Sequence, residues 1–365
     1  MRLLVDCIPW DLGKSGISAY TRGLLAELRR QGHALTLLAE PGAEIDAGTG
    51  LPTVRAPGWT RKPLASMLWH LYALPGWIRR HKGEFDGMVI CAANRRVCAK
   101  YPLPTVAVVH DLANFRIPGK YSRSRMIYLA HVLPRYAKRA QHLVAVSGAT
   151  ADDMVRFWGC REGDVTVLHE GFPRPPEGWG RAAGARNLLY ISRIEHPGKN
   201  HVRLIEAYGR LPRALAEAHP LVLAGGDWKD AEAVKAAAAA SPHAEFIRFT
   251  GFVAPGEAME RLWAETGFYV FPSLFEGFGI SLAEAMSRGI PCACSGNGAL
   301  AEVAGDAAVT FDPEDAADIA RGLETLLGEG ADARAARVAR GLARAEAFSW
   351  EAHVRGMIDL FGGQK

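Results

Sequence analysis

The chain has 365 residues, of which 49% are hydrophobic and 22% charged. This length exceeds one hydrophobic core of ordinary size, and the apolar content is too high for a disordered chain, so we expect two domains. No apolar run reaches the roughly 18 residues that a membrane-spanning helix needs, and Asp6 interrupts the amino-terminal apolar stretch before a signal-peptide core could form. We therefore expect a cytoplasmic protein.

The charges are unevenly distributed along the chain. Residues 1–180 hold 24 Lys and Arg against 15 Asp and Glu, whereas the remainder holds 19 against 24. A basic half favours an anionic partner such as phosphate groups, lipid head groups or nucleic acid. The sequence has neither zinc-finger spacing nor an aromatic RNP-type run, so we expect no nucleic-acid partner. Its six cysteines form no CxxC pair, and we expect free thiols.

Short β-rich runs alternate with helical stretches, which is typical of parallel βαβ units. The expected strands lie near Leu3 and at residues 106–109, 143–146, 188–191, 221–224 and 268–271. Residues 171–186, rich in Pro, Gly and Arg, are expected to form a linker. We thus predict an α/β protein with two doubly wound, Rossmann-like domains, residues 1–175 and 182–345, facing a central cleft. Residues 346–365, with Ser349 as the helix cap, should return to the first domain.

The first strand is followed by a loop from Cys7 to Ile17 that contains Gly13 and Gly16, before a helix expected near Ser18. The dinucleotide fingerprint G-x-G-x-x-G is absent from this loop, which argues against an NAD-binding protein.

An apolar, aromatic stretch at residues 64–78 has basic flanks. The flanking cations are Arg61, Lys62, Arg79, Arg80 and Lys82, and a second basic series, interleaved with tyrosines, follows at residues 116–139. The stretch is too short to span a bilayer, and its apolar run is interrupted by His70 and the Pro75–Gly76 pair. It is either a helix that packs on the first domain with a solvated basic face, or a segment that lies in the interface of an anionic membrane.

His110 ends the expected strand at residues 105–110. Side chains at the carboxyl end of a parallel strand lie at the edge of the sheet where ligands bind. A single His at such a place is either structural or catalytic. Later in the chain, the AGGD run around Gly225 ends a strand, where it forms either a nucleotide contact or a plain turn.

The most informative stretch is Phe271 to Gly289, FPSLFEGFGISLAEAMSRG. A strand is expected to end at Pro272 and a glycine-containing loop to follow, with Ser281 opening a helix whose positive end suits a phosphate. Ser281 and Glu284 also have the spacing of a capping box, which is a structural alternative for Glu284. Glu276 lacks such an alternative, because Gly277 and Gly279 argue against a helix continuing through it.

The segment EGFGISLAE, in which Glu276 and Glu284 form an E-x7-E pattern, resembles the donor-site motif of the GT4 family of retaining glycosyltransferases. Upstream, SRIEHPGKN resembles the family segment that supplies an Arg and a Lys to the donor diphosphate, and Arg193 and Lys199 match those positions. Shorter similarities are GHALTLL at Gly32, VVHDL at Val108, AVS at Ala145, TGFV at Thr250 and SWEAH at Ser349. Together they cover nearly the whole chain and imply the GT-B fold.

The resemblance also implies roles for the matched residues. Glu284 would bind the nucleotide ribose, Glu276 and His110 the donor sugar, and Arg193 and Lys199 the leaving diphosphate. The residues assigned to donor binding besides Glu284 are Gly277, Phe278, Gly279, Ile280, Gly16 and Gly225. At Gly16 the sequence departs from the family's Gly-Gly pair, since Ser15 precedes it.

The function implied is a retaining hexosyltransferase that moves a sugar from a nucleotide diphosphate donor to a glycan or lipid-linked acceptor, in bacterial cell-surface polysaccharide synthesis. The sequence holds no Asp-x-Asp motif, so we expect no metal and no other cofactor. The protein would be cytoplasmic, with a peripheral position on the inner face of the cytoplasmic membrane as the alternative. Other functions left open are a nucleotide-sugar epimerase on the same fold and a non-catalytic sugar-nucleotide-binding protein.

Overall fold

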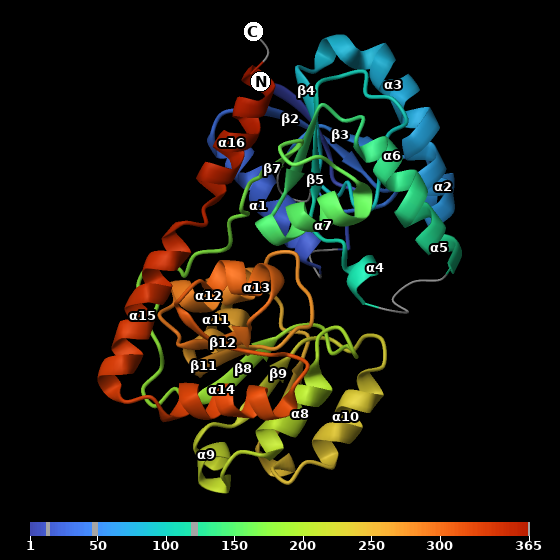
Figure 1. Cartoon of the computed structure of the whole chain (residues 1–365). Helices are drawn as coiled ribbons and strands as arrows, with labels where there is room; N and C mark the ends of the chain where they lie inside the picture. Colours follow the sequence, from blue (N-terminus) through green and yellow to red (C-terminus); the bar gives the residue numbers. More distant parts are fainter. Residues whose placement is uncertain (12–14, 46–49, 118–122, 364–365) are drawn as a thin grey trace. The chain divides into compact units, whose positions relative to one another are not determined.

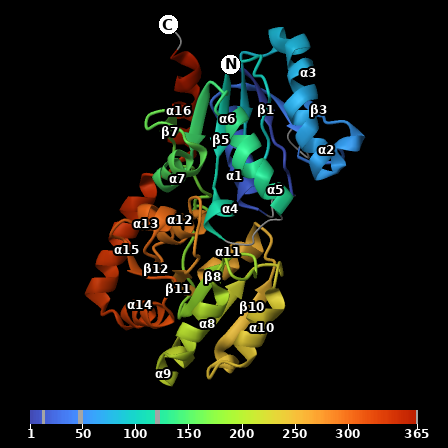
Figure 2. The ribbon, with the colours of Figure 1, turned by 45° about the vertical axis from the view of Figure 1, so that its right-hand side comes forward.

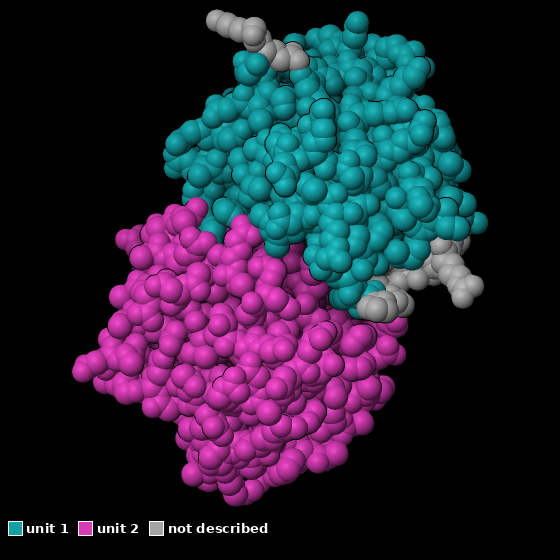
Figure 3. Space-filling model, viewed as in Figure 1, with its two compact units in different colours: residues 1–172, 348–365 teal, residues 173–347 magenta. Residues whose placement is uncertain are grey.

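The computed structural model describes residues 1–11, 15–45, 50–117 and 123–363. They form two compact units, unit 1 with Met1–Phe172 and Phe348–Lys365, and unit 2 with Pro173–Ala347 (Figure 3). Each unit is described by itself, and the cleft expected between them stays a prediction. Gly13 of the expected loop, and Lys120 and Tyr121 of the second basic series, lie outside the described residues.

The described residues of unit 1 contain a seven-stranded parallel sheet with the order β3-β2-β1-β4-β5-β6-β7 (Figure 1). The strands are β1 Arg2–Asp6, β2 Ala34–Ala39, β3 Thr53–Arg55, β4 Gly87–Ile90, β5 Thr105–Val109, β6 His142–Ala145 and β7 Val165–Val167. Every residue of β5 is buried, as expected for an apolar strand covered by helices on both faces. The carboxyl ends of the strands lie at one edge, which Asp6 and the residue after β5, His110, both reach.

The helices of unit 1 are α1 Gly16–Arg30, η1 Gly58–Arg61, α2 Pro63–Leu68, η2 Trp69–Ala73, α3 Leu74–His81, η3 Lys82–Glu84, α4 Ala113–Arg116, α5 Arg123–Ile127, η4 Tyr128–Val132, α6 Leu133–Ala137, α7 Gly148–Trp158 and α16 Trp350–Gly362. Figure 2 shows α2 and α3, like α5 and α6, as continuous helical segments. The stretch at residues 64–78 is helical, as in the first of the two alternatives from the sequence. The π-helical turns η2 and η4 end two residues before Pro75 and Pro134. Each helix thus accommodates the missing proline N–H by widening for one turn.

Helix α16 packs closely on unit 1. Its cap is Ser349, whose Oγ accepts a hydrogen bond from Ala352 N at 3.1 Å, as the sequence predicted. A Cβ atom placed at Gly23 of α1 would lie 2.2 Å from the Trp350 ring, and one at Gly87 would lie 2.6 Å from Phe361. These two glycines therefore permit the close approach of α16.

The described residues of unit 2 contain a six-stranded parallel sheet with the order β10-β9-β8-β11-β12-β13. Its strands are β8 Asn187–Ile191, β9 Leu221–Ala224, β10 Ile247–Gly251, β11 Thr266–Phe271, β12 Cys292–Ser295 and β13 Ala308–Phe311. Its helices are α8 His201–Gly209, α9 Arg213–Ala218, α10 Ala231–Ala239, η5 Ala244–Phe246, α11 Glu257–Ala264, α12 Ile280–Ser287, α13 Gly298–Ala304, α14 Ala316–Gly328 and α15 Ala331–Glu346. In this doubly wound order the direction in which successive strands are added reverses between β8 and β11, and such sheets bind ligands at this point.

Candidate functional site

In unit 2, the loop after β8 is held against the neighbouring loop by backbone hydrogen bonds. Ile194 N donates to Gly226 O at 3.0 Å, and Trp228 N donates to Ile194 O at 3.0 Å. A Cβ at Gly225 would lie only 1.8 Å from Ser192 O, so this close contact requires glycine. Gly225 is thus explained by packing of the two loops, without a ligand.

The end of the same loop is fixed to the loop that follows β11. Leu274 N donates to Gly198 O at 3.0 Å, and Asn200 Nδ2 donates to Pro272 O and Pro313 O at 2.9 and 2.7 Å. Asn200 is in the left-handed region with φ of 61°, a conformation these two side-chain bonds stabilise. Lys199, the residue before it, is therefore held at the carboxyl edge of the sheet.

This arrangement brings Lys199 and Glu276 together. The Lys199 Nζ donates to Glu276 Oε1 at 2.6 Å, and the two side chains are only 20% and 16% exposed. Tyr190 and Ser273 support the pair, because Tyr190 Oη donates to Lys199 O at 2.9 Å and lies 2.9 Å from Ser273 Oγ. The site thus holds a cation and a carboxylate in fixed positions with limited access to water.

Helix α12 begins at Ile280, one residue earlier than expected, with Gly279 as its cap at φ of 106°. A Cβ at Gly279 would lie 2.6 Å from Leu300 Cδ2, so this cap requires glycine. Ser281 lies inside the helix, where its Oγ accepts a hydrogen bond from Tyr269 Oη at 2.7 Å. The capping-box alternative for Glu284 is therefore wrong.

Glu284 lies on α12 and is partly buried. Desolvation raises its pKa to about 7, with Glu260 acting in the same direction and Arg288 opposing. A group with this pKa changes charge near neutral pH, and its ionised form accepts hydrogen bonds from hydroxyl groups. Gly277 is partly exposed and Phe278 is buried on the loop that joins Glu276 to this helix.

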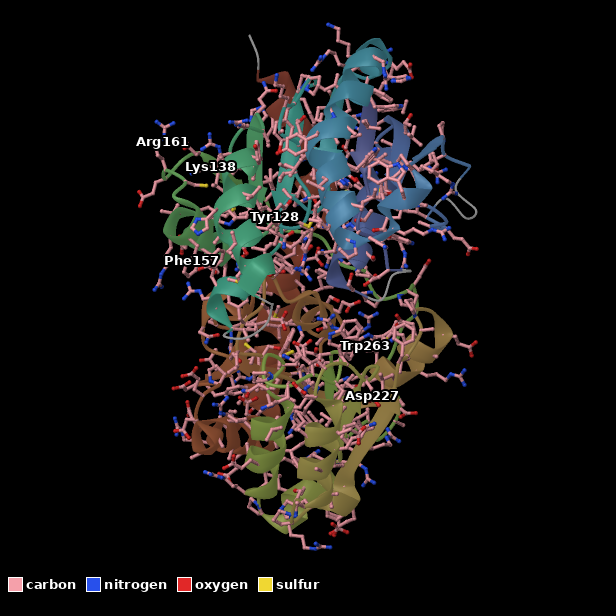
Figure 4. All side chains as sticks on the ribbon, turned by 90° about the vertical axis from the view of Figure 1, so that its right-hand side faces the viewer. Tyr128, Lys138, Phe157, Arg161, Asp227 and Trp263 are labelled. Atoms are coloured by element: carbon pink, nitrogen blue, oxygen red, sulfur yellow. The ribbon has the colours of Figure 1, made fainter. Side chains whose placement is uncertain are left out.

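Arg193 makes different contacts from Lys199. Its guanidinium lies 3.2 Å from Glu195 Oε2 and 5.0 Å from the ring centre of Trp228, which is 60% exposed. Asp227, labelled in Figure 4 beside Trp228 in the sequence, is paired with Lys235 at 2.5 Å. The Arg193 side chain is 39% exposed, so it remains accessible at the same sheet edge.

In unit 1, His110 is buried and both of its ring nitrogens face the protein. Nε2 donates to Cys91 O at 2.7 Å, and Nδ1 lies 4.0 Å from Glu170 Oε2. Burial lowers the pKa of His110 to about 4 and raises that of Glu170 to about 8, so both groups are neutral at pH 7. The Nε2 of His110 is thus engaged by the protein backbone, and Nδ1 is the ring nitrogen nearer to Glu170.

Gly16 is the first residue of α1, and Ser15 caps that helix by accepting a hydrogen bond from Ser18 N at 3.3 Å. The helix thus begins before the expected Ser18. A Cβ at Gly16 would meet no atom within 4 Å among the described residues, so protein packing does not require glycine there.

Two family models together match most of the chain. "Glycosyltransferase Family 4" matches residues 14–174, and "Glycosyl transferases group 1" matches residues 176–341. The sequence is 31% identical to the O-antigen chain mannosyltransferase B of Escherichia coli over 67% of this chain and 67% of that protein. The chain belongs to the group 1 glycosyl transferases.

A second relative of this glycosyl transferase is longer. The serotype-specific mannosyltransferase WbdA of Escherichia coli is 29% identical over 68% of this chain but only 32% of its own length. The Anabaena protein HepE, solved with UDP and glucose, has a TM-score of 0.74 at 16% identity, covering 99% of each chain. The predicted family and GT-B fold class are confirmed.

The structure brings together only some of the predicted site residues of this glycosyl transferase. In unit 2 it joins Lys199 to Glu276 and places Arg193, Gly225 and Glu284 on the loops and helix beyond the same sheet edge. His110 and Gly16 belong to unit 1. Sequence reasoning missed Tyr190 and Asn200, although Asn200 ends the quoted SRIEHPGKN segment.

Within the part of the chain that the structure describes, no three His, Cys, Asp or Glu side chains are grouped so as to hold a metal ion. All six cysteines are buried and unbridged. Among the described helices of this glycosyl transferase, none is long and apolar enough to cross a membrane.

Proposed function

We propose that the chain transfers a hexosyl group from a nucleotide diphosphate sugar to a glycan or lipid-linked acceptor, with retention and without a metal, in bacterial surface-polysaccharide synthesis. The observation that carries this proposal is the Lys199–Glu276 pair at the carboxyl edge of unit 2. A diphosphate sugar needs a cation for its phosphates and acceptors for its hydroxyls, and this pair supplies both groups. The mannosyltransferase names of the relatives support a hexosyl donor.

Four side chains of unit 2 would have separate roles in this reaction. Lys199 and Arg193 offset the charge that develops on the diphosphate as the bond from its oxygen to the anomeric carbon breaks. Glu276 accepts hydrogen bonds from sugar hydroxyls, and Glu284 accepts them from the ribose. The acceptor hydroxyl attacks the same face of the sugar from which the diphosphate leaves, and a phosphate oxygen takes its proton.

The test uses the full chain with UDP-, GDP- and dTDP-hexoses, since the nucleotide base is open. A bound donor at about 100 times its dissociation constant would stabilise the fold by about 2.7 kcal/mol, which thermal unfolding detects. Product from the stabilising donor and a mannose-terminated acceptor should keep the donor's anomeric configuration by NMR, in EDTA as well as without it. Loss of activity in EDTA that Mn²⁺ restores, an inverted product, or isomerised sugar formed without acceptor would each contradict the proposal.

We further propose that unit 1 docks on an anionic membrane. Five large apolar side chains are exposed around α2 and α5: Trp59, Leu64, Leu68, Tyr72 and Ile127. The two segments adjoin, since Tyr72 of η2 interacts with Tyr136 of α6. Arg61, Lys62 and Arg125 are exposed beside them. Trp69, Leu71, Leu74 and Ile78 of the same segment are buried, so the helix is amphipathic.

Flotation with phosphatidylglycerol and phosphatidylcholine vesicles tests this docking. Binding should be confined to the anionic vesicles and weaken with salt. The double variant Leu64→Gln/Leu68→Gln should bind less than the wild type, whereas Leu342→Gln, at an exposed leucine of α15 in unit 2, should not differ from it. Equal flotation of these two variants would show that the α2 surface is not the docking face.

A further inference from the structure

Two loops of unit 2 lie side by side beyond the carboxyl ends of β8 and β9. The backbone of Ile194 joins them through both its N–H and its carbonyl, and it forms an isolated parallel bridge with Asp227. The Ile194 side chain is only 1% exposed, whereas the side chain of Arg193 before it is 39% exposed and Trp228 after Asp227 is 60% exposed. The bridge therefore places an accessible cation next to an accessible indole.

The Arg193 guanidinium contacts two side chains of different chemistry. Its central carbon lies 5.0 Å from the centre of the Trp228 ring, within the range of a cation–π contact. Its Nη2 lies 3.2 Å from Glu195 Oε2. A carboxylate accepts hydrogen bonds from the guanidinium, whereas an indole has an N–H donor and no acceptor. Trp228 can therefore hold the Arg193 side chain without occupying its N–H groups as an acceptor.

This difference decides which contact is compatible with a bound diphosphate. Phosphate oxygens accept hydrogen bonds from a guanidinium fork, so they would compete with the Glu195 carboxylate for the same N–H groups of Arg193. They would not compete with the Trp228 ring, which attracts the cation through its face. The contact with Trp228 can thus persist when a diphosphate replaces Glu195. A side chain that is already held in place loses less conformational freedom on binding.

We infer that Trp228 is a positioning residue, which holds the Arg193 guanidinium where the diphosphate of the donor leaves. The inference rests on the proposed function, because that function gives Arg193 its role. The two cations after β8 would then have separate supports: Lys199 is held through Asn200 and Glu276, and Arg193 is held by Trp228. Each support comes from a loop after a different neighbouring strand, so both cations are fixed on the same sheet edge.

The first measurement concerns the free chain and needs no donor. Heteronuclear NMR follows the Nε–H signal of Arg193, which is assigned by its absence in Arg193→Met. The ring current of Trp228 should shift this signal, and Trp228→Leu should remove the shift and make the side chain more mobile. Trp228→Phe, which keeps an aromatic face, should retain most of the restraint. An Arg193 signal that is unchanged in Trp228→Leu would overturn the inference.

The second measurement is the binding of UDP, GDP and dTDP to the full chain by calorimetry. For the nucleotide that binds most tightly, Trp228→Leu should weaken binding about 2- to 5-fold, the range expected for loss of an exposed cation–π contact, and Trp228→Phe should restore most of the affinity. The melting temperature should change little, because the Trp228 side chain is 60% exposed. In turnover assays, Trp228→Leu should raise the donor KM and also lower kcat, since Arg193 offsets charge during bond breaking.

A double-mutant cycle distinguishes positioning from a direct contact of Trp228 with the donor. In an Arg193→Met chain, Trp228→Leu should have no further effect on nucleotide affinity, because the guanidinium through which it acts is gone. An equal loss of affinity in both backgrounds would show that the indole stacks on the nucleotide itself, and would overturn the positioning role. Glu195→Gln should not weaken binding. Weaker binding in that variant, with none in Trp228→Leu, would assign the positioning to Glu195 instead.

Phe246→Leu is the matched control, because it removes a ring from the same kind of arrangement elsewhere in unit 2. Arg213 lies 5.3 Å from the centre of the Phe246 ring and pairs with Glu245 at 2.7 Å. These residues lie in η5 and α9, before the amino-terminal end of β10. Phe246→Leu should leave nucleotide affinity and the Arg193 signal unchanged. A loss of affinity equal to that of Trp228→Leu would show that the effect is not specific to Arg193 and would overturn the inference.

The outcomes separate this inference from the proposed function. Weaker nucleotide binding in Arg193→Met, together with unchanged binding in Trp228→Leu, would overturn the role of Trp228 alone. A chain that binds no nucleotide, or that binds it equally well with and without Arg193, would reject the proposed role of Arg193. Positioning for the diphosphate would then fail with it, even where the NMR signal shows that the two side chains are in contact.

Discussion

Replacing Glu276 by glutamine separates a role in catalysis from a role as the counter-ion of Lys199. The substitution keeps the size of the side chain but removes the charge that lies 2.6 Å from Lys199 Nζ. If Glu276 holds the donor sugar in the transition state, kcat should fall at least about 100-fold, equivalent to about 2.7 kcal/mol. The unpaired Lys199 is partly buried, so the free energy of unfolding should also fall, by about 1–3 kcal/mol.

The double variant Lys199→Met/Glu276→Gln tells the two roles apart. Removal of both charges should restore much of the lost stability, because neither charge is then left unpaired. Activity should stay at least as low as in either single variant, since both side chains would contact the donor. Steady-state kinetics and denaturant unfolding on the same preparations give both quantities.

Glu245→Gln is the matched control for this experiment. Glu245 pairs with Arg213 at 2.7 Å in the same unit, in η5 before the amino-terminal end of β10. This pair is exposed and screened by solvent, so its loss should change the free energy of unfolding little and leave kcat unchanged. Recovery of activity in the double variant, or unchanged kcat in Glu276→Gln, would show that Glu276 acts only as a counter-ion.

Three further predictions concern packing and titration. Gly23→Ala should lower the melting temperature, because the added Cβ would clash with Trp350. Gly76→Ala should instead stabilise its helix by about 0.5–1 kcal/mol, because a Cβ there meets no described atom within 4 Å. Equal shifts of the two variants in thermal unfolding would contradict this. The pKa of Glu170 is raised to about 8, so the folded state binds the Glu170 proton more tightly than the unfolded state does. The contribution of Glu170 to the free energy of unfolding should therefore fall as the pH rises from about 4.5 to about 8. Glu170→Gln should therefore gain roughly 4 kcal/mol relative to wild type over that range, and a pH-independent difference would refute the assignment. Glu284, with a pKa of about 7, should bind the ribose more tightly when ionised, so donor affinity should rise between pH 6 and 8 in wild type but not in Glu284→Gln.

Much of the fold could be predicted because its strands are short, apolar and buried on both faces. The runs at residues 106–109 and 221–224 coincide with β5 and β9. Seven of the described strands were not among those predicted: β2, β3, β4, β7, β10, β12 and β13. In β3 and β7, two of the three residues are only partly buried and give no apolar run. A helix at residues 64–78 was one of the two alternatives from the sequence, whereas the π turn before Pro75 leaves no pattern that could have predicted it.

The candidate site residues were predicted from sequence motifs, and the contacts that surround these residues were not predicted. Glu276 and Lys199 are 77 positions apart, and their pairing depends on backbone contacts between two loops that no local pattern encodes. The side-chain bonds of Asn200 depend in the same way on two segments distant in the sequence. The capping-box pattern at Ser281 was misleading, because the helix cap is Gly279 and Ser281 lies inside the helix, where its Oγ accepts a hydrogen bond from Tyr269 Oη.

The pairing of Lys199 with Glu276 in the free chain has a consequence for donor binding. Both side chains lose most of their water when the chain folds, and each then keeps one strong partner. A diphosphate sugar would replace the partner of each side chain: phosphate oxygens would contact Lys199 in place of Glu276, and sugar hydroxyls would contact Glu276 in place of Lys199. These two groups are already desolvated and are positioned by Asn200 and Tyr190. Donor binding therefore does not have to supply the free energy of desolvating and ordering them. For the same reason, a chain that keeps only one of the two charges should be less stable than a chain that keeps both or neither. Catalysis, in contrast, should require both charges.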